Sequence, residues 1–268
     1  MPTVSRISIA PVKGLALVHP DEVKLERTGV LENRRFHIVD GDGRRYNQIR
    51  NGGLVQIRPE YDAGAERLAL HFPDGSVADG DVMTGDEVTT DFYGRPVSGK
   101  LVEGPWSEAL SSWAGRPLQL VLSPPGEAVD RDRGHVSLVS RASLTELGGQ
   151  AVTEPVDGRR FRMLFELEGC SPHEEDGWIG RNIRIGEAVA RLRGDVGRCA
   201  ITTQNPETGK PDFDTLRTIS AYRFAENDAG ERHIPFGVYG EVLQPGRVAI
   251  GDVVAVAEPS RLDQAPLN

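Results

Sequence analysis

The sequence predicts a mainly β protein with a few helices (α+β), in which an N-terminal β-barrel-like domain precedes a second domain that is also rich in strands. Short segments that alternate apolar and polar residues recur along the chain, and Gly and Pro residues separate them. Segments with helical spacing are few and short. The 268 residues suffice for one large core or two moderate ones. We expect the domain boundary where the first helical segment begins, between domain 1–105 and domain 106–268.

The first domain is expected to consist of strands joined by tight turns. Its strand candidates are residues 4–9, 22–27, 36–39, 44–46, 68–72 and 88–93. Asp40-Gly41-Asp42-Gly43 lies between two of them and predicts a hairpin, because Asp-Gly pairs favour the turns that join antiparallel strands. Pro73-Asp74-Gly75 predicts a second hairpin with a short return strand. Many short strands with such turns are typical of a barrel or a sandwich.

The second domain is expected to combine further strands with about three helices. The helix candidates are residues 106–113, ending before Gly115, residues 141–147, beginning after a capping Ser140, and residues 214–223. The strand candidates are residues 118–122, 136–139, 159–167, 184–193, 238–243 and 248–256. We expect the last two strands to pair as a hairpin through residues 244–247.

Charge and hydropathy exclude some classes of partner. Lys plus Arg number 31 against 40 Asp plus Glu, and the resulting net charge of -9 disfavours binding to nucleic acid or to an anionic membrane. No run approaches the roughly 18 consecutive apolar residues that a membrane span needs. The first residues also lack the basic and apolar regions of a signal peptide. We therefore expect a cytoplasmic protein with no nucleic-acid or membrane partner.

The cysteine count limits the cofactors that the chain can hold. Cys170 and Cys199 could make at most one disulfide, which a chain this long does not need. They are too few for an iron–sulfur cluster, and no C-x-x-C pair suggests a structural zinc site. The sequence also lacks G-x-S-x-G and G-x-G-x-x-G, so serine hydrolysis and a tightly held dinucleotide have no support.

Three stretches look like known ligand sites but are better explained as ordinary structure. Residues 94–100 fit most of a P-loop string, yet Leu101 stands where a hydroxyl must reach magnesium. Residues 40–43 begin like a calcium loop, but arginines follow where oxygen ligands belong. We interpret both as turns. Residues 170–176 contain metal-competent side chains at a spacing that matches no zinc pattern, which favours an acidic surface loop.

Cys199 is the candidate reactive group of the chain. Arg198 precedes it, and a neighbouring guanidinium favours the thiolate, the form that attacks electrophiles or binds soft metals. Free cysteine is also among the most buried residue types and often just fills space, so local chemistry alone favours that bland interpretation of Cys199. Further cations stand at or near strand candidates: Lys13, Arg34, Arg35, Arg160 and Arg162. Each could be a solvated surface charge, whereas together they would suit a phosphorylated cofactor.

The order of these residues resembles the MOSC superfamily, named for the C-terminal domains of molybdenum cofactor sulfurases. The closer resemblance is to the branch with an N-terminal MOSC-type β-barrel, which includes the mitochondrial amidoxime reducing component and bacterial reductases of N-hydroxylated bases. The resemblance covers nearly the whole chain, and it implies that the second domain is a MOSC β-barrel domain. It rests on Pro11-Val12-Lys13-Gly14, Arg34 before Phe36, Val139-Ser140, Arg160-Phe161-Arg162, Glu175-Asp176-Gly177-Trp178, Arg198-Cys199 with Thr202-Thr203, Asn205-Pro206-x-Thr208-Gly209, Phe236-Gly237-x-Tyr239 and Gly251-Asp252.

The resemblance implies a molybdenum cofactor (molybdopterin) with Cys199 as the metal ligand and catalytic residue. The contacts that it implies to the pterin and its phosphate are Lys13, Arg34, Ser140, Arg162, Arg198 and Tyr239. A thiolate is a soft metal ligand, and arginine and lysine suit a phosphate. The implied activity is the reduction of a small N-hydroxylated compound from N–OH to N–H. The electrons would come from a separate ferredoxin-, flavin- or cytochrome-type protein, since the chain has no cluster, flavin or nicotinamide fingerprint.

Two other functions remain open from the sequence. Cys199 could carry a persulfide and deliver sulfur to an acceptor, or the chain could be a non-catalytic module that binds the molybdenum cofactor. The sequence also departs from the family pattern at two places. Met163-Leu164 follows Arg162 where family members often have Pro-Asn, and Gly14 stands where a serine commonly follows the lysine. These departures leave the cofactor contacts at these positions, and the substrate choice, open.

Overall fold

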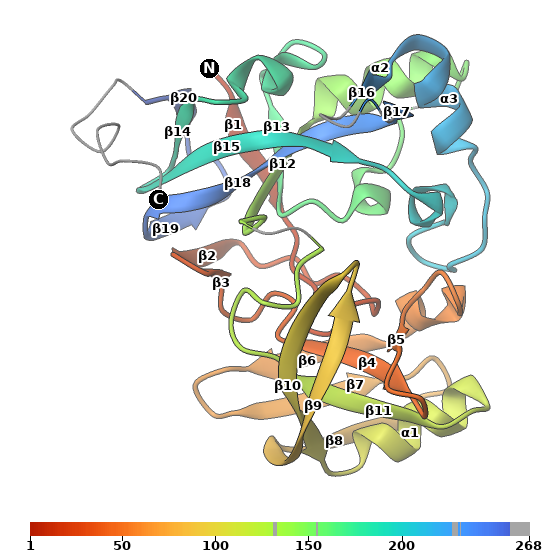
Figure 1. Cartoon of the computed structure of the whole chain (residues 1–268). Helices are drawn as coiled ribbons and strands as arrows, with labels where there is room; N and C mark the ends of the chain where they lie inside the picture. Colours follow the sequence, from red (N-terminus) through yellow and green to blue (C-terminus); the bar gives the residue numbers. More distant parts are fainter. Residues whose placement is uncertain (131–132, 154, 227–229, 231, 258–268) are drawn as a thin grey trace.

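The computed structural model describes residues 1–130, 133–153, 155–226, 230 and 232–257 (Figure 1). Over these residues the protein is mainly β with three α-helices, which confirms the predicted fold class. Figure 1 shows two β-rich parts, a barrel in the upper half and a second group of sheets in the lower half. The segment between β1 and β4 runs from one part to the other.

The upper part is a seven-stranded sheet that is nearly closed into a barrel. Its strands, in spatial order, are β1 (Thr3–Ile7), β13 (Phe165–Glu168), β12 (Val136–Ser140), β18 (Pro235–Gln244), β15 (Ala188–Gly197), β14 (Asn182–Ile185) and β20 (Val254–Val256). Thr3 and Val253 form an antiparallel bridge between the two ends of this sheet. The alternation of strand side chains sends Val, Ile and Leu residues inward, where they form the largest buried cluster.

The lower part contains two sheets and one helix. Its five-stranded sheet has the order β5 (Arg45–Tyr46), β4 (Phe36–Asp40), β11 (Leu118–Leu122), β10 (Arg95–Glu103) and β9 (Met83–Phe92). A three-stranded sheet joins β6 (Arg58–Asp62), β7 (Arg67–His71) and β8 (Val77–Asp81). Helix α1 (Trp106–Ala114) anchors this core with Trp106, which is fully buried and donates a hydrogen bond of 3.1 Å to the carbonyl of Leu68.

Each of the two parts contains strands from both sides of the predicted domain boundary. β1 belongs to the barrel sheet although it begins the chain, and β11 pairs with β4 and β10 although it follows α1. A second three-stranded sheet joins β2 (Glu22–Glu26), β3 (Gly29–Val30) and β19 (Gly246–Ala249). A division between domains 1–105 and 106–268 therefore stays a prediction, since hydrogen bonds of the sheets cross it.

The three helices begin at or next to the predicted residues, and the first ends as predicted, whereas the second continues to Gln150, past its predicted end at residue 147. Helix α1 ends at Gly115, whose φ of 65° is the left-handed conformation that favours glycine. Helix α2 (Arg141–Gln150) begins after Ser140, whose hydroxyl oxygen accepts a hydrogen bond from the amide of Ser143. Helix α3 (Thr215–Tyr222) begins after Asp214, which caps it through the amide of Arg217. No helix within the described residues is long and apolar enough to cross a membrane.

The predicted Asp-Gly hairpins are confirmed, whereas three other local predictions are wrong. β4 pairs with β5 and β7 pairs with β8, as expected. β19 pairs with β2 instead of forming a hairpin with β18, because β18 is already flanked by β12 and β15. Most of residues 94–100 is strand β10 instead of a turn. Residues 159–164 precede β13 and include a 3-10 helix at Gly158–Phe161, so Arg160 and Arg162 are not in a strand.

The predicted acidic surface loop at 170–176 is also different in the structure. Residues Glu174–Trp178 form a 3-10 helix, and Glu175 is fully buried. Its Oε1 accepts hydrogen bonds from the amide of Ser140 at 3.1 Å and from the hydroxyl of Ser143 at 2.8 Å. A buried carboxylate needs such donors, and they come from the start of α2, which the local sequence does not reveal.

Candidate functional site

A cavity of about 340 Å³ lies where the two parts of the chain meet; we call it the central cavity. Its lining combines residues of the segment after β1 and of the lower part with residues in and next to the barrel strands. Six of the seven predicted site residues line it: Lys13, Arg34, Arg162, Arg198, Cys199 and Tyr239. Residues far apart in the sequence thus form one positively charged cavity with a thiol.

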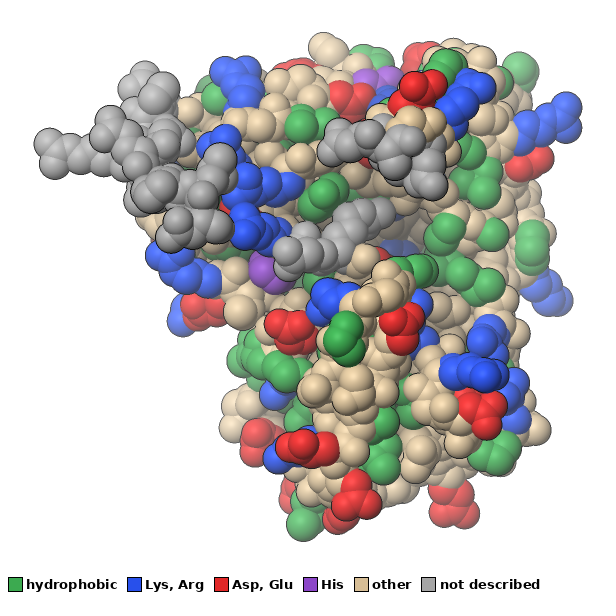
Figure 2. Space-filling model, viewed as in Figure 1, with side chains coloured by type: hydrophobic (Ala, Val, Ile, Leu, Met, Phe, Trp, Pro, Cys, Tyr) green, Lys and Arg blue, Asp and Glu red, His purple; other side chains and the backbone are tan. Residues whose placement is uncertain are grey.

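The distribution of charge differs between the two parts of the molecule. Figure 2 shows Lys and Arg side chains gathered over the barrel on the visible face, whereas acidic side chains are scattered over the lower part. The net charge of the chain is -9, so the cationic lining of the central cavity departs from the average of the molecule. Such a local excess of positive charge attracts anionic ligands.

Lys13 is a buried cation held by a carboxylate. Its Nζ lies 2.7 Å from Oδ1 of Asp130, and only 12% of its side chain is exposed. Burial lowers the pKa of Lys13 to about 8; Arg34 and Arg45 act in the same direction, and Asp130 opposes them. Lys13 therefore remains mainly charged at pH 7, next to two further cations.

Arg34 and Arg162 are fixed by unusual backbone conformations. Their φ angles of 53° and 51° lie in the left-handed region, which non-glycine residues rarely adopt, and both residues line the cavity. Arg34 donates a hydrogen bond to the carbonyl of Arg162 at 3.3 Å, and Arg162 donates one to the carbonyl of Leu15 at 2.7 Å. Burial and the nearby Arg34 lower the pKa of Arg162 to about 9.

Arg198 is held by acceptors on both sides of its guanidinium group. Nε donates to the carbonyl of Phe236 at 2.8 Å, and Nη1 donates to the carbonyl of Phe161 at 3.1 Å. Nη2 lies 2.9 Å from the sulfur of Met163, and the guanidinium also stacks over the Phe161 ring at 5.0 Å. Arg198 is therefore a rigid part of the cavity wall beside Cys199.

Cys199 is exposed, which favours a reactive or ligand-binding thiol over a space-filling one. It follows the end of β15 and precedes the 3-10 helix Ala200–Thr203. Its carbonyl accepts hydrogen bonds from the amide and the hydroxyl of Thr202, so its backbone is fixed. Cys170 is half-buried, lies outside the central cavity, and has its pKa raised to about 12 by burial and by acidic neighbours.

Tyr239 and Ser140 differ in their access to the cavity. Tyr239 lies on β18 and lines the cavity beside Ser137. Ser140 is fully buried, and its hydroxyl lies 2.7 Å from the hydroxyl of Ser143 while it caps α2. Ser140 does not line the central cavity. Its structural role is accounted for by the helix cap and by Glu175.

The two departures from the family pattern have local structural reasons. Gly14 has a φ of 96°, a conformation that L side chains rarely adopt, so a serine here would be strained. Met163 supplies a sulfur acceptor to Arg198 and is 5% exposed. Leu164 is also buried in the barrel core, where an amide would need a partner.

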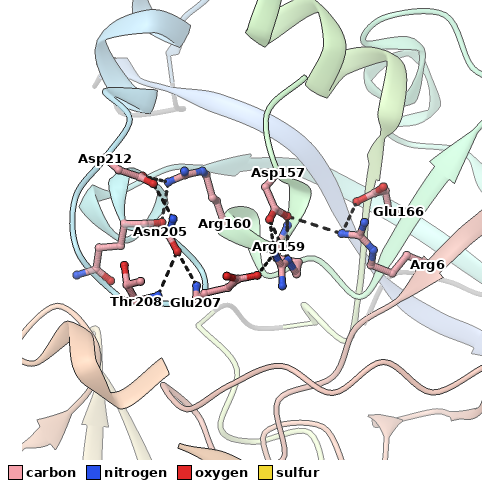
Figure 3. A network of polar contacts seen from close by, with 10 residues as sticks. Arg6, Asp157, Arg159, Arg160, Glu166, Asn205, Glu207, Thr208 and Asp212 are labelled. Carbon is pink, nitrogen blue, oxygen red and sulfur yellow. Dashed lines mark hydrogen bonds and ion pairs between the residues drawn. The ribbon is translucent and has the colours of Figure 1, made fainter. Parts of the chain in front are cut away.

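The contacts of Arg160 carried no signal in the sequence, where this residue stood out only as a cation near a strand candidate. Its Nη1 lies 2.6 Å from Oδ1 of Asp212 and donates to the carbonyl of Gln204 at 2.8 Å (Figure 3). Asn205 donates to the other oxygen of Asp212 at 2.7 Å and accepts from the amides of Glu207 and Thr208. The Asn205 turn and the cavity wall are thus held by one network.

The same view shows a second group of ion pairs beside this turn (Figure 3). Arg159 lies 2.6 Å from Asp157 and 2.9 Å from Glu207, and Arg6 of β1 lies 3.2 Å from Glu166 of β13. Asp157 caps the 3-10 helix that carries Arg160. These pairs position the residues before Arg162 against the barrel.

The described residues contain no group of three or more His, Cys, Asp or Glu side chains that could hold a metal ion. A metal in the central cavity would therefore need ligands from a cofactor in addition to Cys199. The fold and the cavity define a β-barrel protein that combines cations for an anionic ligand with one accessible thiol.

The chain belongs to the MOSC domain proteins that carry a MOSC N-terminal beta barrel. The model of the MOSC domain matches residues 126–255, and the model of the MOSC N-terminal beta barrel domain matches residues 1–114. This confirms the resemblance that the sequence motifs indicated.

Similar proteins carry two different names. The chain is 25% identical to mitochondrial amidoxime-reducing component 1 of Xenopus laevis, over 94% of this chain and 81% of that protein. It is 28% identical to the molybdenum cofactor sulfurase of Drosophila grimshawi, over 95% of this chain but only 34% of that protein. Among solved structures, the YUAD protein from Bacillus subtilis aligns with 95% of this chain and 94% of its own, at 12% identity and a TM-score of 0.46.

Proposed function

We propose that this protein is a molybdenum-cofactor-binding oxidoreductase that reduces small N-hydroxylated compounds. The observation that carries the proposal is the convergence of an exposed thiol, Cys199, and four cations of separate segments, Lys13, Arg34, Arg162 and Arg198, in one cavity. A similar protein is named an amidoxime-reducing component, and an amidoxime is an N-hydroxylated amidine. This name supports the substrate class.

The residues present fit a pterin cofactor that carries a phosphate. The cavity supplies several cations within a chain of net negative charge, and guanidinium groups bind phosphate oxygens through paired hydrogen bonds. Cys199 supplies one soft thiolate ligand, as a metal already bound by cofactor sulfurs would require. Tyr239 offers a hydroxyl in the same cavity. Ser140 makes no contact with the cofactor in this proposal, because it is buried in the cap of α2.

The residues of the cavity have two roles in this proposal. Lys13, Arg34 and Arg162 hold the phosphate, and Arg198, fixed by two backbone carbonyls, positions Cys199 and adds positive charge. When bound, the cofactor would supply two-electron redox chemistry at its metal. The net reaction converts N–OH to N–H and water, and it consumes two electrons and two protons. The electrons come from a separate ferredoxin-, flavin- or cytochrome-type protein.

A turnover assay tests the proposal. Protein purified from cells able to make the cofactor is supplied with an aromatic amidoxime and a chemically reduced dye as electron donor, and formation of the amidine is measured. Wild-type protein is expected to turn over, Cys199→Ser to lose turnover, and Cys170→Ser to retain it. An inactive wild-type protein with a full complement of molybdenum would contradict the reductase assignment and favour a non-catalytic cofactor-binding module.

A sulfur carrier is the second candidate, because Cys199 is exposed and a similar protein is named a molybdenum cofactor sulfurase. In that function Cys199 bears a persulfide. Cyanide releases such sulfur as thiocyanate, so the two functions are separated by measuring cyanolysable sulfur and molybdenum in the same preparation. Sulfur on Cys199 without molybdenum would support the carrier.

A further inference from the structure

The carboxylate of Asp130 lies in the central cavity, between two buried cations. Its Oδ1 is 2.7 Å from Nζ of Lys13 and 3.9 Å from Nη1 of Arg45. The side chains of Lys13 and Arg45 are 12% and 17% exposed, whereas that of Asp130 is 37% exposed. A single carboxylate oxygen thus faces two positive charges that have little access to water.

Arg45 is held rigidly at this place. Its guanidinium lies 4.0 Å from the ring centroid of Tyr93 and 4.8 Å from that of Phe92, and Lys13 lies over the same Phe92 ring at 5.6 Å. Nη1 of Arg45 is buried and has no hydrogen-bond partner among the described residues. A distance of 3.9 Å to Asp130 is too long for a hydrogen bond. Nη1 of Arg45 therefore lies near the carboxylate of Asp130 without forming a hydrogen bond to it.

Asp130 offsets only part of the positive charge around it. Burial lowers the pKa of both Lys13 and Arg162, and the charge of Asp130 raises both pKa values while Arg34 lowers them. Asp130 is therefore within electrostatic reach of cations on both sides of the cavity. One carboxylate faces Lys13, Arg34, Arg45 and Arg162, so a more highly charged anion would be favoured here.

We propose that Lys13 and Arg45 form an anion subsite, and that Asp130 is an internal anion which a ligand's phosphate group replaces. A phosphate carries more acceptor oxygens than a carboxylate, so it can bind Lys13 and also satisfy Nη1 of Arg45. The inference rests on the proposed function for the source of the phosphate. It adds Arg45 to the binding residues and makes Asp130 a competitor of the ligand. If Asp130 instead were a permanent partner, it would position Lys13, and its removal would weaken binding.

Titration of cofactor-free protein with inorganic phosphate, followed by calorimetry, separates these two roles. Asp130→Asn is expected to bind phosphate about twofold to fivefold more tightly than wild type, because a partly exposed ion pair no longer competes. Asp42→Asn is the matched control, since Asp42 also pairs with an arginine, Arg44 at 3.6 Å, but is 72% exposed. The control is expected to leave the affinity unchanged.

Arg45 is tested in the same assay. Arg45→Met is expected to weaken phosphate binding about tenfold, both in wild type and in Asp130→Asn, and Arg45→Lys to retain part of the affinity. Thermal unfolding of each variant verifies that it is folded. Unchanged or weaker binding by folded Asp130→Asn, or unchanged binding by folded Arg45→Met, would overturn the inference. Phosphate binding needs neither molybdenum nor turnover, so this result is independent of whether the reductase assignment holds.

Discussion

Replacing Gly52 by alanine tests how the turn after Cys199 is held against the lower part of the molecule. Gly52 begins the 3-10 helix Gly52–Gln56, and Gly209 ends the Asn205 turn. A Cβ on Gly52 would lie 2.2 Å from the carbonyl oxygen of Gly209. Ordinary contact distances are roughly 3.5 Å, so the turn or the helix must move by about 1 Å.

This movement lowers the free energy of unfolding. Overpacking of this kind costs about 1–3 kcal/mol of unfolding free energy. Gln204 of the moving segment donates a hydrogen bond of 2.8 Å to the carbonyl of Gln48, which lines the central cavity. For a protein of this size, about 2–4 °C of melting temperature corresponds to 1 kcal/mol, so Gly52→Ala should lower the melting temperature by about 2–12 °C.

The measurement is thermal and urea unfolding of Gly52→Ala beside a control. Gly149→Ala is the matched control, because Gly149 lies in α2 with nothing within 4 Å of its added Cβ. Alanine there is expected to stabilise the protein by up to about 1 kcal/mol. If Gly52→Ala unfolds at the same temperature as wild type, the close approach of Gly52 and Gly209 does not hold the two parts together, and our account of this contact fails.

Three further predictions concern charged residues. Burial lowers the pKa of Lys13 to about 8, so its side chain loses its charge as pH rises from 7 to 9. Sulfate binding to cofactor-free protein, measured by calorimetry at several pH values, is therefore expected to weaken over this range. Lys13→Met should remove this pH dependence. Burial raises the pKa of Glu175, so its ionisation disfavours the folded state as pH rises above the ordinary carboxyl range. The stability of Glu175→Gln relative to wild type should therefore increase from pH 4 to pH 7 in urea unfolding, and a constant difference would refute this. Arg198→Lys removes the guanidinium group that donates hydrogen bonds to the carbonyls of Phe161 and Phe236. The free energy of unfolding, measured in urea, should fall by about 2–4 kcal/mol. An unchanged free energy of unfolding would show that these hydrogen bonds are dispensable.

Local features of the fold were predictable from the sequence because local chemistry determines them. The Asp-Gly turn at residues 40–43 joins β4 and β5, and Gly115 ends α1 in the left-handed conformation. The pairing of β19 was not predictable, because β2 lies more than two hundred residues away along the chain. Only the folded barrel shows that both edges of β18 are already occupied.

The residues of the candidate site were likewise only partly predictable from the sequence. Cys199 and the cations stood out by residue type and by family order, and six of the seven predicted residues line the central cavity. Ser140 was correctly expected to cap a helix, and that cap buries it away from the cavity. Asp130 and Arg45 carried no signal, since an aspartate in a charged stretch and an arginine after a turn resemble solvated surface residues. Their roles depend on contacts between distant segments.

Molybdenum content measures the central claim most directly. Wild-type protein, Cys199→Ala and Cys170→Ala are purified from cells able to make the cofactor, and the metal is determined by mass spectrometry. We predict about one molybdenum per chain in wild type and in Cys170→Ala, and a large loss in Cys199→Ala, because Cys199 is the protein's thiolate ligand. Metal-free wild-type protein, or unchanged molybdenum in Cys199→Ala, would contradict the account.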